Sequence, residues 1–137
     1  MELVTGAIAQ GKTRVLAKMV AENSRFSAST VFSCELTESE MLNRIFQEKL
    51  KYNIEGLYPI NIINFREKDD NELFKQIETT RTNYIFIDCY SSIIRKEFVD
   101  ALNELEKKLC KSIVITKQLT RDKTIEGVSI VTYKKED

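Results

Sequence analysis

The segment at residues 6–13 constrains this chain more than any other. It reads G-x-x-x-x-G-K-T, the pattern of a loop that binds phosphate between a strand and a helix. Residues 2–5 can form the short strand that enters such a loop. Residues 13–23 carry apolar side chains at the spacing of one helix face, at Val15, Leu16, Met19 and Val20. The motif and its flanks therefore predict a strand, a phosphate-binding loop and a helix, in that order.

The chemistry expected of this loop follows from its residue types. Glycine at both ends lets the loop curl so that backbone N–H groups point at a phosphate, and the helix N-terminus adds its dipole. Lys12 would reach the β- and γ-phosphates of a nucleotide, and the Thr13 hydroxyl would bind Mg²⁺. The residues predicted to hold the nucleotide are Gly6, Ala7, Ile8, Ala9, Gln10, Gly11, Lys12, Thr13 and Arg14. We expect Lys12 to be exposed when no phosphate is bound. The alternative is a glycine-containing turn with an exposed lysine.

Strand-like and helix-like segments alternate along the rest of the chain. Runs rich in β-forming residues lie at 30–34, 60–65, 84–87, 112–116 and 128–133. Near-continuous apolar strands separated by helices predict an α/β fold, a three-layer α/β/α sandwich with a mainly parallel sheet. The 137 residues are 42% hydrophobic and contain no linker-like tract, so we expect a single domain over residues 1–137.

The helix expected over residues 37–51 has clear local signals. Thr37 followed by Glu40 gives the pattern of a capping box, and Asp69 can cap the helix after it. The apolar stripe of the 37–51 helix consists of Met41, Leu42, Ile45, Phe46 and Leu50. A stripe of this kind typically faces the core.

Composition narrows the class of protein. Lys plus Arg and Asp plus Glu each total 21, so no general basic surface for nucleic acid is indicated, and the absence of histidine excludes histidine bases and ligands. No stretch approaches about 18 consecutive apolar residues, and no secretory signal is visible, so neither a membrane-spanning helix nor a membrane partner is expected. The cysteines Cys34, Cys89 and Cys110 lie in apolar surroundings without a Cys-x-x-Cys pattern, which predicts reduced core residues in a cytoplasmic protein.

Three polar residues follow predicted strands, where parallel sheets gather their ligand-binding groups. Asp88 ends the most apolar strand and could hold Mg²⁺ through its water shell. Glu35 follows the second strand and could orient a water for attack. Gln118 follows the fifth strand, where its amide could contact both a phosphate and a water. Asp88 can alternatively cap a loop, and acidic residues such as Glu35 often end strands without a catalytic role.

Together these segments resemble the RecA-like P-loop ATPases, most closely the ATPase domain of DnaB-type replicative helicases of bacteria and phages. That family has a P-loop, a strand F-S-x-E-M with the catalytic Glu, a Walker B strand, and then S-Q-L-x-R, whose Gln senses the γ-phosphate. The chain has Phe32-Ser33-Cys34-Glu35-Leu36 and Lys117-Gln118-Leu119-Thr120-Arg121 in the same order. The resemblance implies that Glu35 and Gln118 are catalytic and that the strand order is 3-2-4-5-1-6. It also implies that Lys134 and Lys135 stand where the family usually has an Arg that reaches a neighbour's ATP.

The sequence leaves three functions open. The first is a helicase-like domain that binds and hydrolyses ATP in DNA replication or recombination. Its partners would be single-stranded DNA and either a RecA-like ATPase or further copies of itself. The second is a non-catalytic nucleotide-binding regulator that docks on a RecA-like ATPase ring. The third, a small-molecule kinase, would need an arginine-rich lid, and no compact one is visible in the sequence.

Overall fold

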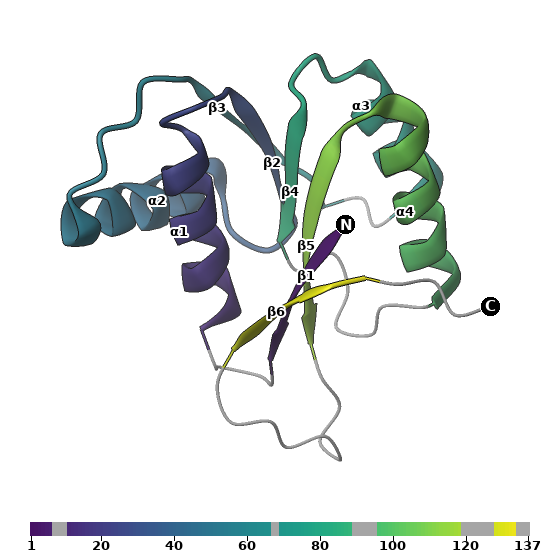
Figure 1. Ribbon diagram of the computed structural model, residues 1–137, viewed down its shortest axis with the longest axis horizontal. Helices are drawn as coiled ribbons and strands as arrows, with labels where there is room; N and C mark the ends of the chain where they lie inside the picture. The colour runs from purple at the N-terminus through teal and green to yellow at the C-terminus, as the bar shows by residue number, and fades with distance from the viewer. Residues whose placement is uncertain (7–10, 67–68, 89–95, 119–127, 134–137) are drawn as a thin grey trace.

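The computed structural model describes residues 1–6, 11–66, 69–88, 96–118 and 128–133 (Figure 1). The strands are β1 (Glu2–Gly6), β2 (Ser29–Ser33), β3 (Ile60–Asn64), β4 (Tyr84–Asp88), β5 (Ser112–Gln118) and β6 (Ser129–Thr132). The helices are α1 (Lys12–Asn23), α2 (Glu38–Tyr52), α3 (Asp70–Thr79) and α4 (Lys96–Leu109). Each strand and helix expected from the sequence is present, and the predicted strand bounds differ from the observed ones by one or two residues at most.

The strands form one six-stranded sheet with the order β3-β2-β4-β5-β1-β6, which confirms the expected order. Neighbouring strands are parallel except β1 and β6, which run antiparallel. The register places Ser33 beside Asp88 and Gly6 beside Gln118. The carboxyl ends of the parallel strands therefore lie along one edge of the sheet, and the predicted site residues are located at this edge.

Helices cover both faces of this sheet, with α1 and α2 on one side and α3 and α4 on the other (Figure 1). Consecutive residues of a strand point to opposite sides, so two separate cores form. Val4 and Val114 pack with α1 and α2, whereas Leu3 and Ile115 pack with α3 and α4. Strands buried on both sides have no polar face, which accounts for the near-continuous apolar runs in the sequence.

Local signals fix where two of the helices begin. The Thr37 hydroxyl accepts from the Glu40 backbone N–H at 3.1 Å, and the Glu40 carboxylate accepts from the Thr37 backbone N–H at 3.2 Å. This is the complete capping box at the start of α2. Asp69 caps α3 by accepting from the backbone N–H groups of Asn71 and Glu72. Both caps were predicted from the sequence and are confirmed.

The apolar stripe of α2 is only partly buried. Met41 and Ile45 are enclosed, but Leu42, Phe46 and Leu50 are 52%, 56% and 67% exposed. The expectation that the stripe faces the core is wrong for these three side chains. The reason is the position of α2, which packs on α1 and on the edge strand β3, so that only one flank of the helix has a sheet beneath it (Figure 1).

The cysteines follow their prediction in part. Cys34 is a buried thiol, as expected, and Cys89 lies outside the described residues. Cys110 is exposed, so its prediction as a core residue is wrong. It follows the last residue of α4 with a left-handed φ of 53°, and this conformation ends the helix and turns the side chain away from the core.

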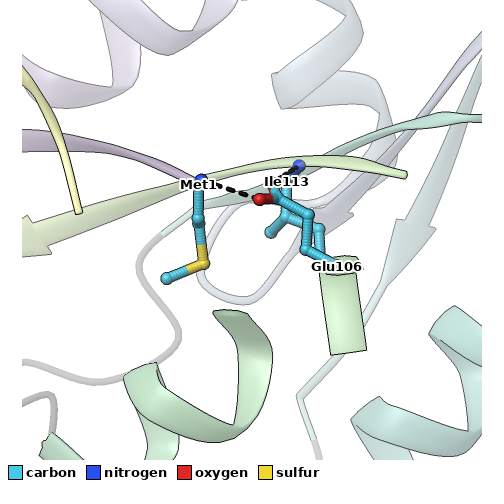
Figure 2. Close-up of polar contacts among 3 residues, drawn as sticks. All are labelled: Met1, Glu106 and Ile113. Carbon is cyan, nitrogen blue, oxygen red and sulfur yellow. Dashed lines mark hydrogen bonds and ion pairs between the residues drawn. The ribbon is translucent and has the colours of Figure 1, made fainter. Parts of the chain in front are cut away.

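Glu106 on α4 joins three parts of the fold (Figure 2). One carboxylate oxygen accepts from the Met1 amino group at 2.7 Å, and the other accepts from the Ile113 backbone N–H at 2.7 Å. The side chain therefore ties α4 to the beginnings of β1 and β5. Because the Glu106 side chain is only 16% exposed, solvent screens its ion pair less than it screens a pair on the open surface.

We expect Glu106→Gln to lower the free energy of unfolding by about 1–2 kcal/mol, because the amide loses the charge that pairs with the Met1 amino group. Chemical denaturation at neutral pH measures this loss. Glu78→Gln, an exposed position on α3, is the control and should change stability by less than about 0.5 kcal/mol. Equal effects of the two substitutions would contradict a structural role for the Glu106 contacts.

Candidate functional site

A buried carboxylate lies at the carboxyl edge of the sheet. Asp88 ends β4 and is 2% exposed. The Thr13 hydroxyl, from the first turn of α1, lies 3.3 Å and 3.1 Å from the carboxylate oxygens Oδ1 and Oδ2. The Thr116 hydroxyl of β5 donates to Oδ1 at 3.2 Å. Two hydroxyl groups from separate elements therefore fix the Asp88 carboxylate between α1 and β5.

Burial raises the pKa of the Asp88 carboxyl above its ordinary value, because removal of water disfavours the charged form. The hydroxyls of Thr13 and Thr116 stabilise the charged form and oppose this rise in pKa. The nearby Glu35 carboxylate raises the pKa further, and the Lys12 ammonium lowers it. The net shift of the Asp88 pKa is upward, so a cation beside the carboxylate would relieve part of the cost of burying its charge.

The beginning of α1 suits an incoming anion. Gly11 precedes the helix with φ 87° and ψ 29°, a left-handed conformation that favours glycine, and no side chain caps the helix. The first turn contains no acidic residue and instead carries Lys12 and Arg14. Within the helix, therefore, no carboxylate competes with an anion for the backbone N–H groups and the positive end of the dipole.

Lys12 folds back toward the strand that precedes it. Its ammonium donates to the Gly6 carbonyl oxygen at 3.2 Å, and its side chain is only partly exposed. The expectation of an exposed lysine is therefore wrong, because a backbone carbonyl takes the place of water as acceptor. The contact holds the ammonium near the residue at which the motif begins. The motif residues Ala7, Ile8, Ala9 and Gln10 lie outside the described residues.

Glu35 lies just beyond the end of β2. The Ser33 hydroxyl donates to the Leu36 carbonyl oxygen at 2.7 Å, and the Cys34 backbone N–H donates to the Asp88 carbonyl oxygen at 3.3 Å. These bonds form a turn that keeps the exposed Glu35 close enough to Asp88 to influence its pKa. The two predicted carboxylates therefore lie near each other because β2 and β4 are neighbours in the sheet.

Gln118 is the last residue of β5, and its backbone pairs with that of Gly6 at the end of β1. Its side chain is outside the described part of the structure, as are Lys134 and Lys135. The predicted site residues that the structure describes thus lie at or just beyond the ends of β1, β2, β4 and β5 and at the beginning of α1.

Thr116 was not among the residues singled out from the sequence, although it contacts Asp88 directly. In the sequence, Thr116 is marked only as a hydroxyl residue that follows the apolar run 113–115 and lies two positions before Gln118. Threonine is common in strands for reasons of backbone fit, so this pattern alone does not indicate a polar role. The role follows from the pairing of β5 with β4, which brings a side chain that is 1% exposed against the carboxylate.

Comparisons with known proteins leave the family of the chain open. The search of protein-family models finds no match, and neither does the search of curated proteins. Among the described residues, no helix is long and apolar enough to cross a membrane. The same residues contain no cluster of three or more histidine, cysteine or acidic side chains that could hold a metal ion. The function must therefore be inferred from the site's own geometry.

We expect Asp88→Asn to raise the free energy of unfolding by about 1 kcal/mol at about pH 7.5. The amide can keep partners for Thr13 and Thr116 while a buried charge is removed. Because the folded-state pKa of Asp88 is raised, the folded protein binds this proton more tightly than the unfolded chain does. The native aspartate therefore costs stability at neutral pH, and this cost disappears as the pH falls through the raised pKa.

Chemical denaturation at about pH 7.5 and about pH 4 measures the difference, and the gain from Asp88→Asn should shrink at the lower pH. The exposed Glu55→Gln is the control. A loss of stability that is larger at about pH 7.5 than at about pH 4 would instead show that the charged carboxylate stabilises the fold.

Proposed function

We propose that the chain is a RecA-like P-loop domain that binds ATP with Mg²⁺ and hydrolyses it in DNA replication or recombination. The observation that carries this proposal is the 3.1 Å contact between the Thr13 hydroxyl and the Asp88 carboxylate. It joins the helix that follows the G-x-x-x-x-G-K-T motif to an acidic residue at the end of a parallel strand. These are the two positions from which P-loop NTPases hold Mg²⁺.

The donor set fits Mg²⁺, a hard cation that takes oxygen ligands. Thr13 offers a hydroxyl oxygen and Asp88 offers a carboxylate. The two groups lie 3.1 Å apart, so the hydroxyl could bind the cation directly while the carboxylate holds it through its water shell. A bound cation would also stabilise the charged form of Asp88, which burial disfavours.

The phosphate groups of the nucleotide are assigned to the beginning of α1. Gly11 permits the left-handed turn before the helix, and Lys12 and Arg14 are the cations of its first turn. The Lys12 ammonium donates to the Gly6 carbonyl oxygen at 3.2 Å, which keeps it at the residue where the motif begins. This supports a role for Lys12 in binding phosphate.

Glu35 is assigned the hydrolytic role. ATP with Mg²⁺ would supply a terminal phosphate whose charge is partly neutralised. Glu35 is exposed and close to Asp88, and a carboxylate in this position can orient a water and accept its proton. Gln118 is given the phosphate-sensing role, because its backbone lies beside Gly6 at the same edge.

The partners in this proposal rest on the resemblance to DnaB-type helicases. They are single-stranded DNA and either a RecA-like ATPase or further copies of the chain. Lys134 and Lys135 are assigned the contact with a neighbour's nucleotide. Lysine is a point charge that lacks the two-pronged hydrogen bonding of arginine, so we expect this contribution to be modest.

Lys12→Ala should weaken the binding of ATP with Mg²⁺ about a hundredfold while leaving the fold intact, because it removes a charged hydrogen-bond donor to phosphate. Isothermal titration calorimetry measures the affinity. Lys75→Ala, an exposed lysine on α3, is the matched control. Equal affinities of Lys12→Ala and the parent chain would exclude a P-loop nucleotide site.

Glu35→Gln should retain nucleotide binding and lose about 10²–10⁴-fold in turnover, because it removes the base with little change of shape. Phosphate release with and without single-stranded DNA measures turnover, and Glu38→Gln is the control. Unchanged turnover in Glu35→Gln would refute the assigned role. Binding without turnover by the parent chain would instead favour the non-catalytic regulator.

A further inference from the structure

Exposed apolar side chains on α2 form a surface separate from the candidate nucleotide site. Leu42, Phe46 and Leu50 are 52%, 56% and 67% exposed and follow one another at four-residue intervals, so they form one stripe along the helix, here called the α2 stripe. A groove of about 430 Å³ runs beside it, lined by Ser39, Leu42, Asn43, Ile45, Phe46 and Lys49. Contiguous exposed apolar surface of this kind typically marks an interaction site.

The two ends of the α2 stripe carry charges of opposite sign. Glu38 lies in the first turn of α2, and Lys49 lies in the last. With about 100° of rotation per residue, both fall on the same flank of the stripe, within about 40° of Leu42. Among the described residues neither side chain makes an ion pair or a hydrogen bond. The surface therefore offers one acidic end, an apolar middle and one basic end.

Lys49 lies between the groove and the segment that follows α2. A Cβ atom on Gly56 would lie 2.6 Å from the Lys49 ammonium and 2.4 Å from the Ser24 hydroxyl oxygen. The Lys49 ammonium therefore lies against the backbone of Gly56. The lysine is half-buried at the rim of the groove, where its pairing with an acidic group would be screened less by solvent than on an open surface.

We propose that the α2 stripe is the contact surface for a second copy of this chain, with the two α2 helices antiparallel about a twofold axis. Such an axis pairs the beginning of one helix with the end of the other, so the same patch serves on both copies. Leu42 of each copy then packs on Phe46 of the other. Glu38 of each copy lies opposite Lys49 of the other, and the two helix dipoles are oriented favourably.

The size of the stripe sets the strength of this dimer. Stable dimers bury about 800 Å² per subunit, and a 15-residue helix, about 23 Å long, offers less than that. We therefore expect a dimer that depends on concentration, with a Kd between about 10 µM and about 1 mM. The groove shares no residue with the candidate nucleotide site, so the dimer does not depend on the proposed ATPase activity.

Sedimentation velocity over a concentration series that spans this range tests the proposal. The dimer fraction of the parent chain should rise with concentration, and Phe46→Ser should raise the Kd about tenfold or more. Phe26→Ser is the matched control, because Phe26 is 77% exposed but does not line the groove. It should leave the Kd unchanged. Circular dichroism of each variant verifies that it is folded.

Reversal of the end charges tests the antiparallel pairing. Glu38→Lys gives a stripe with two basic ends, and Lys49→Glu gives one with two acidic ends, so each variant alone should associate about tenfold more weakly than the parent. An equimolar mixture should regain parental association, because both end contacts are again between opposite charges. In a parallel contact the parent would already oppose like charges at both ends, so the mixture would associate more tightly than the parent. Weaker association of each variant alone and a return to the parental level in the mixture therefore identify an antiparallel contact between two α2 helices.

Three results would overturn the proposal. One is a parent chain that remains monomeric up to the highest concentration, which would assign the stripe to a different partner. Another is equal association of Phe46→Ser and the parent. The last is a mixture of the two charge variants that associates no better than either variant alone.

Discussion

The carboxylate of Asp88 has to be accommodated at the end of a strand that is buried on both faces. An unpaired buried carboxylate would cost several kcal/mol. Here two hydroxyl groups, from Thr13 and Thr116, donate to it. Because Thr13 belongs to the first turn of α1, satisfying Asp88 also fixes the beginning of that helix against β4. Together with the buried apolar face of α1, this contact positions Gly11 and Lys12, and hence the expected site for phosphate.

The strand order explains how residues distant in the sequence reach the same place. β4 lies between β2 and β5, and β5 lies beside β1. Asp88 is therefore flanked by the turn that holds Glu35 on one side and by Thr116 on the other. Gly6 and Gln118 end the next pair of strands. Parallel strands all present their carboxyl ends at one edge, so a single edge collects the candidate site.

Apolar surface is distributed unevenly over the helices. α1 lies over the middle of the sheet, whereas α2 lies over the edge strand β3 and carries a wider apolar stripe than that edge can cover. Leu42, Phe46 and Leu50 are therefore left in solvent. A second copy of α2 would complete the burial that the edge of the sheet cannot provide.

The sequence by itself determined the elements and much of their order in space. The alternation of apolar strands and periodic helices, the capping box of Thr37 and the cap of Asp69 are local signals, and each was confirmed because local backbone preferences decide it. The strand order was also expected correctly, through the resemblance to RecA-like ATPases. The nucleotide chemistry assigned to Lys12, Glu35 and Gln118 remains a prediction, since it concerns a ligand and not the fold.

Only the tertiary structure decided which side chains have neighbours. The local pattern around Thr116 is that of many strand residues, yet its hydroxyl donates to Asp88. The local pattern around Leu50 is that of many buried helix residues, yet its side chain lies in solvent. Cys110 sits in an apolar segment but is exposed where α4 ends, and Lys12 is drawn back to the Gly6 carbonyl. In each case the outcome depends on what another part of the chain brings to the same point in space. Periodicity reports which face of an element is apolar, but the packing of the whole sheet determines whether that face is covered.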